Sequence, residues 1–126
     1  MIPTSAAIYS LLTLVVVLFQ FALALGAPWG HLAMGGRFPG KFPPQMRIAA
    51  IVQACVLTVL AVVVLTRSGI VLPEFYEQSY WAIWGVVAIA TLSLVMNLMT
   101  PSRWERILWA PVAGVFLLCS LMVALA

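Results

Sequence analysis

Four long uncharged apolar stretches alternate with three polar connections along the chain. The stretches run over residues 6–26, 48–66, 80–99 and 107–126, and none contains Asp, Glu, Lys, Arg or His. An α-helix rises about 1.5 Å per residue, so about 20 apolar residues cross the hydrocarbon of a membrane. Continuous apolar runs of this length are typical of helices rather than strands. We therefore expect an all-α integral membrane protein, a single domain (residues 1–126) that forms an antiparallel four-helix transmembrane bundle.

The composition agrees with a membrane protein. Hydrophobic residues make up 65% of the 126 residues and charged residues 7%, and the mean hydropathy is +1.17. A soluble domain could not cover that much apolar surface. The four stretches leave little more than connecting loops, so we expect no soluble catalytic module. Because no Lys or Arg precedes the first stretch, we expect it to be a permanent helix rather than a cleaved signal.

Basic residues are distributed unevenly over the connections. The first connection and its edge contain Arg37, Lys41 and Arg47, the third contains Arg103 and Arg106, and the second contains Arg67. Short loops rich in Lys and Arg stay in the cytoplasm. We therefore expect the first and third connections in the cytoplasm and both termini outside, with a bacterial plasma (inner) membrane as the setting. Because the basic residues flank the stretches, the expected partner is the lipid bilayer and not nucleic acid.

The first connection, residues 27–46, is rich in Gly and Pro but also contains large apolar side chains. We expect an ordered Gly/Pro-rich cytoplasmic loop that folds against the bundle. The run from Gly35 to Phe42 partly matches a phosphate-binding loop. However, Phe42 replaces the Ser or Thr that would hold magnesium, and Pro39 removes a backbone amide. We therefore expect no nucleotide.

Several polar or aromatic side chains in the two predicted cytoplasmic loops form a second candidate group: Trp29, His31, Arg37, Arg103, Glu105 and Arg106. His31 is the sole histidine in the sequence, so no multi-histidine metal or haem site can form within one chain, and we expect no metal and no cofactor. His31 could shuttle a proton, or act with Arg37 and Arg103 on a lipid headgroup. The interpretation that we favour is a loop residue making one structural hydrogen bond.

Four polar side chains inside the stretches are the candidate ligand site: Gln20, Gln53, Ser93 and Asn97. Gln20 and Gln53 lie at similar depths from the cytoplasmic ends of neighbouring helices, so they could pair as an amide bridge or line a polar cavity. The amide bridge is the interpretation that we favour. Ser93 and Asn97 continue with Thr100 as a polar stripe on the third helix. These residues would form a vestibule open to the cytoplasm, unless Asn97 instead ties down the third loop.

Aromatic residues near the ends of the stretches are typical of the belt at a membrane interface. They are Tyr9, Tyr80, Trp81 and Trp84 outside and Trp29, Trp104 and Trp109 inside. An offset of about 7 Å along the helix axes strains the reach of a disulfide between Cys55 and Cys119, and we expect both to be small buried hydrophobic residues.

Small residues four apart predict close helix contacts. The pairs are Ala22 and Gly26, Ala50 and Ala54, and Ala110 and Gly114. The fourth helix has two competing start signals, because Thr100-Pro101 reads as a cap with a first helical residue and Ser102 to Glu105 fits a capping box.

The loop motifs resemble those of uncharacterised small bacterial four-span integral membrane proteins. The motifs are Gly26-Ala27-Pro28-Trp29-Gly30, Gly35-Gly36-Arg37 with Pro39-Gly40, and Asn97 with Thr100-Pro101-Ser102-Arg103 and Glu105-Arg106. The resemblance implies four helices and a bacterial membrane, and it carries no reaction or ligand.

Three functions fit the sequence. The one that we favour is a non-enzymatic accessory, assembly or scaffolding subunit that contacts partner membrane subunits through its small-residue grooves. An alternative is an oligomeric binder or transporter of a lipophilic or small neutral ligand, which would use the four polar residues. The third is a membrane enzyme acting on a lipid headgroup, for which Glu105 would have to serve beside His31 as an acid or base.

Overall fold

The computed structural model describes residues 2–32, 40–101 and 103–126, and these residues form four long helices. The helices are α1 (Ile2–Ala24), α2 (Pro44–Arg67), α3 (Tyr76–Met99) and α4 (Arg103–Leu125), with short 3-10 turns η1 (Gly30–Leu32) and η3 (Pro73–Phe75). Each long helix is sufficiently long and apolar to span a membrane. The described residues contain no strand. The predicted all-helical fold with four candidate membrane-spanning helices is therefore confirmed.

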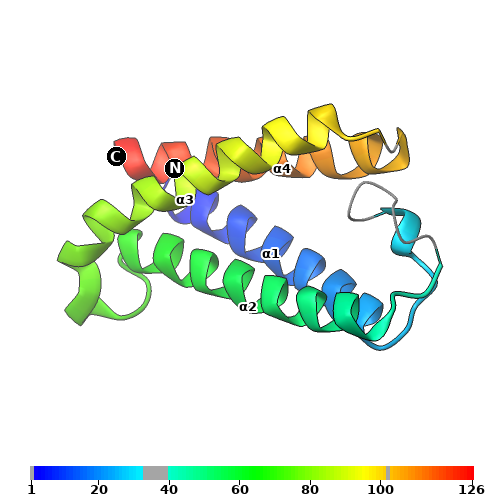
Figure 1. Cartoon of the computed structure of the whole chain (residues 1–126). Coiled ribbons are helices and arrows are strands. Elements are labelled where there is room, and N and C mark those ends of the chain that lie inside the picture. The colour runs from blue at the N-terminus through cyan, green and yellow to red at the C-terminus, as the bar shows by residue number, and fades with distance from the viewer. Residues whose placement is uncertain (1, 33–39, 102) are drawn as a thin grey trace.

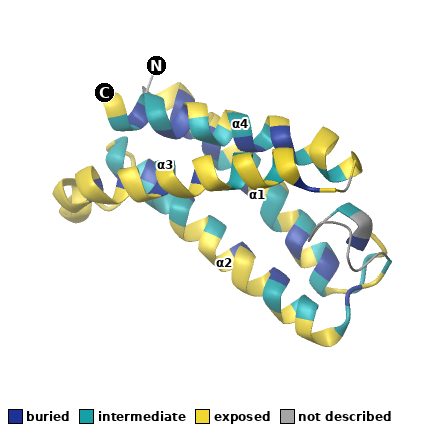
Figure 2. Ribbon diagram, turned by 45° about the horizontal axis from the view of Figure 1, so that its top comes forward, coloured by how far each residue is buried: buried dark blue, intermediate teal, exposed yellow. Residues whose placement is uncertain are grey.

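Consecutive helices run in opposite directions, so both termini lie at one end (Figure 1). We call this end, which also carries the second connection, the terminal end; the loop end carries the first and third connections. Helices α1 and α3 each pack against α2 and α4. Toward the loop end, the pair α1 and α2 diverges from the pair α3 and α4 (Figures 1 and 2). The bundle is therefore closed at the terminal end and splayed at the loop end.

Two separate clusters of buried side chains explain this shape. The larger cluster draws on all four helices at the terminal end, with Ala6, Tyr9, Ala61, Val64, Ile83, Val86, Cys119 and Val123. The smaller cluster consists of Leu23, Phe42 and Ala50, which come from α1, the first connection and α2. Because α3 and α4 contribute nothing to the smaller cluster, the two helix pairs are not packed together by it at the loop end.

Two predicted environments are wrong. Tyr9 is 3% exposed and packs edge-on against Phe116, with ring centroids 4.7 Å apart, so it belongs to the core rather than to an interfacial belt. Cys55 is exposed, whereas Cys119 is buried as predicted. Cys55 directly follows Ala54, which is buried, and successive residues on a helix point about 100° apart. Cys55 therefore faces outward.

The small residues of α2 pack within the chain itself. Ala50 and Ala54 are 2% and 1% exposed, so these positions are covered by neighbouring helices of the same chain. Ala110 on α4 is also buried. Gly26 is not part of a helix, because α1 ends at Ala24 and Gly26 has a left-handed φ of +102°. These positions therefore do not present open grooves to a partner.

The third connection excludes one of the two predicted starts of α4. Pro101 lies in a bend and α4 begins at Arg103, so the register with Pro101 as first helical residue is wrong. The other register depends on Ser102, which lies outside the described residues. At the terminal end, Pro73 begins the turn η3, which continues directly into α3 at Tyr76. Helix α4 continues without interruption through Pro111.

Candidate functional site

A cavity of about 720 Å³ lies between the diverging helix pairs at the loop end. All four helices contribute to its lining, and Leu32 from η1 joins them. The four residues of the predicted ligand site, Gln20, Gln53, Ser93 and Asn97, all line this one cavity. Thr100 and Glu105 are its further polar lining residues, and the remaining lining side chains are apolar. The structure therefore brings the predicted vestibule together.

The polar residues line the part of the cavity nearer the loop end. Counted from the loop end of its own helix, Asn97 is two residues in, Gln20 four, Ser93 six and Gln53 nine. The deepest lining residues, Leu57 and Phe116, are apolar and lie thirteen residues in, about 20 Å at the rise of an α-helix. The cavity thus changes from polar to apolar with depth.

Gln20 is the most unusual residue of the lining. Its side chain is 7% exposed, and it makes no hydrogen bond in the described part of the chain. Among the described residues, the fully buried side-chain polar atom without a partner is the Ser10 hydroxyl oxygen, so the Gln20 amide atoms keep some exposure. Because Gln20 lines the cavity, its amide is available to a molecule bound there. Gln53 lines the same cavity and is exposed, but no hydrogen bond joins the two amides among the described residues. The described residues therefore contain no amide bridge between Gln20 and Gln53.

Asn97 is held along its own helix rather than tying down the third loop. Its Nδ2 donates to the Ser93 carbonyl at 2.7 Å and approaches the Ser93 hydroxyl at 3.4 Å. The third connection is held instead by Arg106, whose guanidinium donates to the Thr100 carbonyl. The Thr100 hydroxyl in turn donates to a Glu105 carboxylate oxygen at 3.4 Å. Asn97 therefore stays on the cavity wall.

Aromatic side chains join the first connection to the loop end of the cavity. Phe19 on α1 stacks on Trp29, with centroids 6.1 Å apart and planes at 7°, and contacts Trp109 of α4 edge-on at 4.9 Å. The Trp109 indole N–H donates to the Leu32 carbonyl at 2.6 Å. Since Phe19, Leu32 and Trp109 all line the cavity, the first connection covers part of its loop end.

The predicted loop group is brought together in part. Trp29 packs on Phe19, Glu105 lines the cavity, and Arg106 bonds the third connection, whereas Arg103 is exposed. The backbone of His31 belongs to η1, which packs against α4. Arg37 lies outside the described residues. Among the described residues, no three His, Cys, Asp or Glu side chains gather where a metal ion would bind.

The roles of Phe19, Leu32 and Trp109 were missed from the sequence. The sequence predicts Trp109 in the interfacial belt, but its indole N–H donates a hydrogen bond to Leu32, which lies 77 positions away. A contact of that separation leaves no mark on local periodicity. The available signal was its position, because Trp109 lies six residues into α4 and is therefore deeper than a belt residue.

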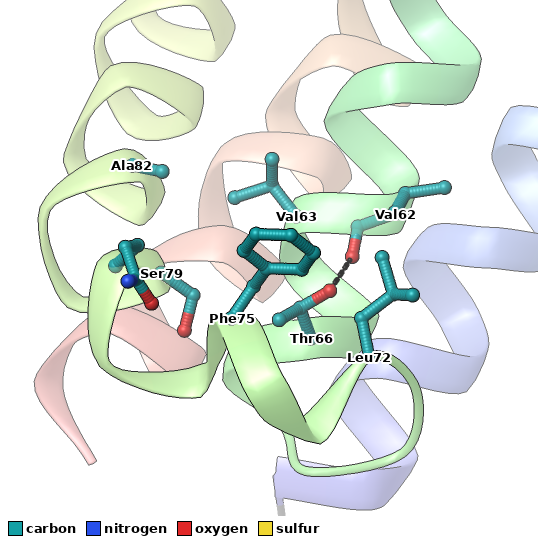
Figure 3. A pocket seen from close by; sticks show the side chains of 8 residues that line it. Val62, Val63, Thr66, Leu72, Phe75, Ser79 and Ala82 are labelled. Atoms are coloured by element: carbon teal, nitrogen blue, oxygen red, sulfur yellow. Dashed lines mark hydrogen bonds between the residues drawn. The ribbon is translucent and has the colours of Figure 1, made fainter.

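A smaller pocket of about 160 Å³ lies at the terminal end between α2, η3 and α3 (Figure 3). The Phe75 ring points toward Val63 and Thr66 of α2. Both hydroxyl donors of this pocket already bond backbone carbonyls, Thr66 to Val62 and Ser79 to Tyr76. The pocket is therefore small and almost wholly apolar, and the larger cavity is the better candidate site.

Comparison with models of known protein families, with curated proteins and with solved structures gives no match.

Proposed function

We propose that this protein is a non-enzymatic membrane protein that binds a lipophilic or small neutral ligand in the cavity between its helix pairs. The observation that carries the proposal is Gln20, a residue only 7% exposed, which lines a cavity of about 720 Å³ and whose amide makes no hydrogen bond in the described part of the chain. A ligand with a hydrogen-bonding group would satisfy this amide. Cavities of about 300–1,000 Å³, mostly apolar with a few polar groups, are typical of small-molecule sites.

The chemistry of the four polar residues supports binding rather than catalysis. The amides of Gln20, Gln53 and Asn97 and the hydroxyl of Ser93 donate and accept hydrogen bonds, but they neither gain nor lose a charge near neutral pH and so are poor general acids or bases. In the proposed setting, a bacterial plasma membrane with the loop end in the cytoplasm, the polar part of the cavity lies on the cytoplasmic side. The placement rests on the excess of Lys and Arg in the first and third connections.

An accessory subunit is the second candidate. One observation favours it: Ala82, Gly85 and Ala88 are exposed at intervals of three residues on α3, and a Cβ added at Gly85 would meet no atom within 4 Å. A partner helix could approach closely along such a surface. The grooves that we expected to serve this role are buried within the chain at Ala50, Ala54 and Ala110. The cavity therefore supports ligand binding better.

The test is gentle purification from the source membrane followed by mass spectrometry of intact complexes. The wild type is compared with Gln20→Leu, and Gln78→Leu is the matched control, because it makes the same change at the small pocket of the terminal end. We expect a small molecule to accompany the wild type and the control. Its occupancy should fall about tenfold in Gln20→Leu, because losing one or two hydrogen bonds costs about 1–2 kcal/mol.

Two outcomes would contradict the proposal. Equal occupancy in Gln20→Leu and Gln78→Leu would show that the cavity is not the site. Stoichiometric foreign subunits, with no small molecule bound, would establish the accessory role instead. In that case, Gly85→Leu should release the partner, and Ala7→Leu, at an exposed position of α1, would be the control.

A further inference from the structure

We infer that the ligand is a single-chain amphiphile with an uncharged hydrogen-bonding head, and that it reaches the cavity sideways between α2 and α3. The inference rests on the proposed function, because it names the ligand class and the access route of the same cavity. Three observations carry it: the unequal exposure of the cavity walls, the side chains at its polar end, and its volume and depth.

The cavity is closed on one side and open on the other. On the side of α1 and α4, Gln20 and Ala113 are 7% and 3% exposed. On α3, Leu92 and Met96 line the same cavity but are 59% and 62% exposed, and Gln53 of α2 is exposed too. The opening therefore lies between the facing edges of α2 and α3, which diverge there (Figure 2). We call this opening the lateral slot.

The lateral slot ends where α2 and α3 pack together toward the terminal end. Val64 of α2 and Ile83 and Val86 of α3 are all buried in the larger core cluster. The slot is thus bounded by the core toward the terminal end. In a bundle of membrane-spanning helices, an opening between two helices at this depth faces lipid rather than water. A molecule dissolved in the bilayer could therefore enter without crossing the loops.

The lining selects an uncharged head. No Lys or Arg lines the cavity among the described residues, so an anionic head would lose its hydration without gaining a cation. Glu105 lies at the loop end of the cavity, where its carboxylate accepts a hydrogen bond from the Thr100 hydroxyl. Glu105 also belongs to the first turn of α4, where the helix dipole stabilises its negative charge. Deeper in, Gln20, Ser93 and Gln53 offer amides and a hydroxyl. These groups bond hydroxyl, amide or carbonyl groups of a neutral head.

The size and shape of the cavity select one chain. At about 30 Å³ per water-sized group, 720 Å³ holds about two dozen non-hydrogen atoms, which corresponds to a monoacylglycerol rather than a two-chain lipid. The polar residues lie near the loop end, and the lining becomes apolar toward Leu57 and Phe116. The head therefore lies near the loop end and the tail points toward the middle of the bundle.

The experiment uses the full chain in phosphatidylcholine vesicles that contain a photoreactive monoacylglycerol with its reactive group in the acyl chain. Matched probes carry a carboxylate head, an amine head or two chains. We expect the monoacylglycerol to label peptides containing Leu57, Ile89 or Phe116 about tenfold more than each matched probe. Leu92→Trp should slow labelling about tenfold by filling the lateral slot. Leu98→Trp, with nearly the same exposure outside the cavity, should not slow it.

The outcomes separate this inference from the proposed function. Equal labelling by a charged or two-chain probe overturns the ligand class. Equal rates in Leu92→Trp and Leu98→Trp overturn the lateral route, and so do equal rates in the second pair, Met96→Trp and Val95→Trp. In either case, reduced labelling in Gln20→Leu but not in Gln78→Leu would leave the proposed function standing. Unchanged labelling in both glutamine variants would contradict the proposed function as well.

Discussion

At the scale of single residues, Gly26 and Arg47 set how the chain leaves α1. The N–H of Ala27 bonds the Ala22 carbonyl at 2.9 Å, and Gly26 has a φ of +102°. The Arg47 guanidinium lies 3.3 Å from where a Cβ on Gly26 would be, and its Nε donates to the Phe42 carbonyl at 2.9 Å. Arg47 therefore bonds the first connection just before α2 and occupies the space beside Gly26 just after α1.

Gly26→Ala should destabilise the protein by about 1–2 kcal/mol, because a side chain at this backbone conformation is strained and would press on Arg47. Gly85→Ala is the control, since Gly85 is helical and a Cβ there meets nothing within 4 Å. This control should stabilise α3 slightly, because Ala favours a helix over Gly. The melting temperatures of the two variants in detergent measure these changes. A shift of the melting temperature in the same direction in both variants would contradict this explanation.

Trp109→Phe should loosen the first connection while keeping a ring against Phe19. The change removes the indole N–H that bonds the Leu32 carbonyl, a bond contributing about 1 kcal/mol. Hydrogen exchange at the amides of Gly30 and Leu32, which bond the carbonyls of Gly40 and Trp29, should rise about fivefold. Trp104→Phe is the control, because Trp104 is 64% exposed on the same helix. Equal exchange in the two variants would refute the role of this hydrogen bond.

At the scale of helices, the bundle is held together by the core cluster at the terminal end. Val64→Ala should destabilise the protein by about 1–3 kcal/mol, because Val64 is fully buried and the lost methyl groups leave a void. Val59→Ala, on the same helix, should change stability little, because Val59 is 60% exposed. Denaturant titration in detergent compares the two variants. Similar losses in both would show that the four helices are not closed by this cluster.

The helices were predictable from the sequence, but their inward faces were not. Uninterrupted apolar stretches near 20 residues fix the number and approximate bounds of the helices. Because these stretches are apolar on every side, no periodicity indicates which side lies inward. Tyr9 and Cys55 were therefore assigned to the wrong environments. For the same reason, nothing in the sequence indicated that the helix pairs diverge at the loop end.

The candidate site was more predictable than the packing around it. Polar residues stand out in apolar stretches, and the prediction that Gln20, Gln53, Ser93 and Asn97 lie together needed little more than their depths from the helix ends. The cover formed by Trp29, Leu32 and Trp109 depends on contacts between distant parts of the chain. Those contacts become visible with the three-dimensional arrangement of the helices.

At the scale of the whole molecule, the charge distribution predicts its orientation. A single cysteine at Gln45, in the first turn of α2 at the loop end, should be shielded in intact cells, and one at Glu74 should react with a membrane-impermeant maleimide. Both positions are exposed, and neither change removes a basic residue. Cys55 and Cys119 are replaced by Ala in both variants. Reaction at Gln45→Cys but not at Glu74→Cys, before permeabilisation, would invert the proposed orientation.

In the proposed function, the Gln20 amide faces a ligand rather than another protein group. The most direct test is nuclear Overhauser spectroscopy on the deuterated protein, with monooleoylglycerol as the protonated probe in deuterated detergent. We predict cross-peaks from the side-chain amide protons of Gln20 and Gln53 to the probe, and none from those of Gln78. Cross-peaks between the Gln20 and Gln53 amides, with none to the probe, would show an amide bridge and contradict ligand binding at Gln20.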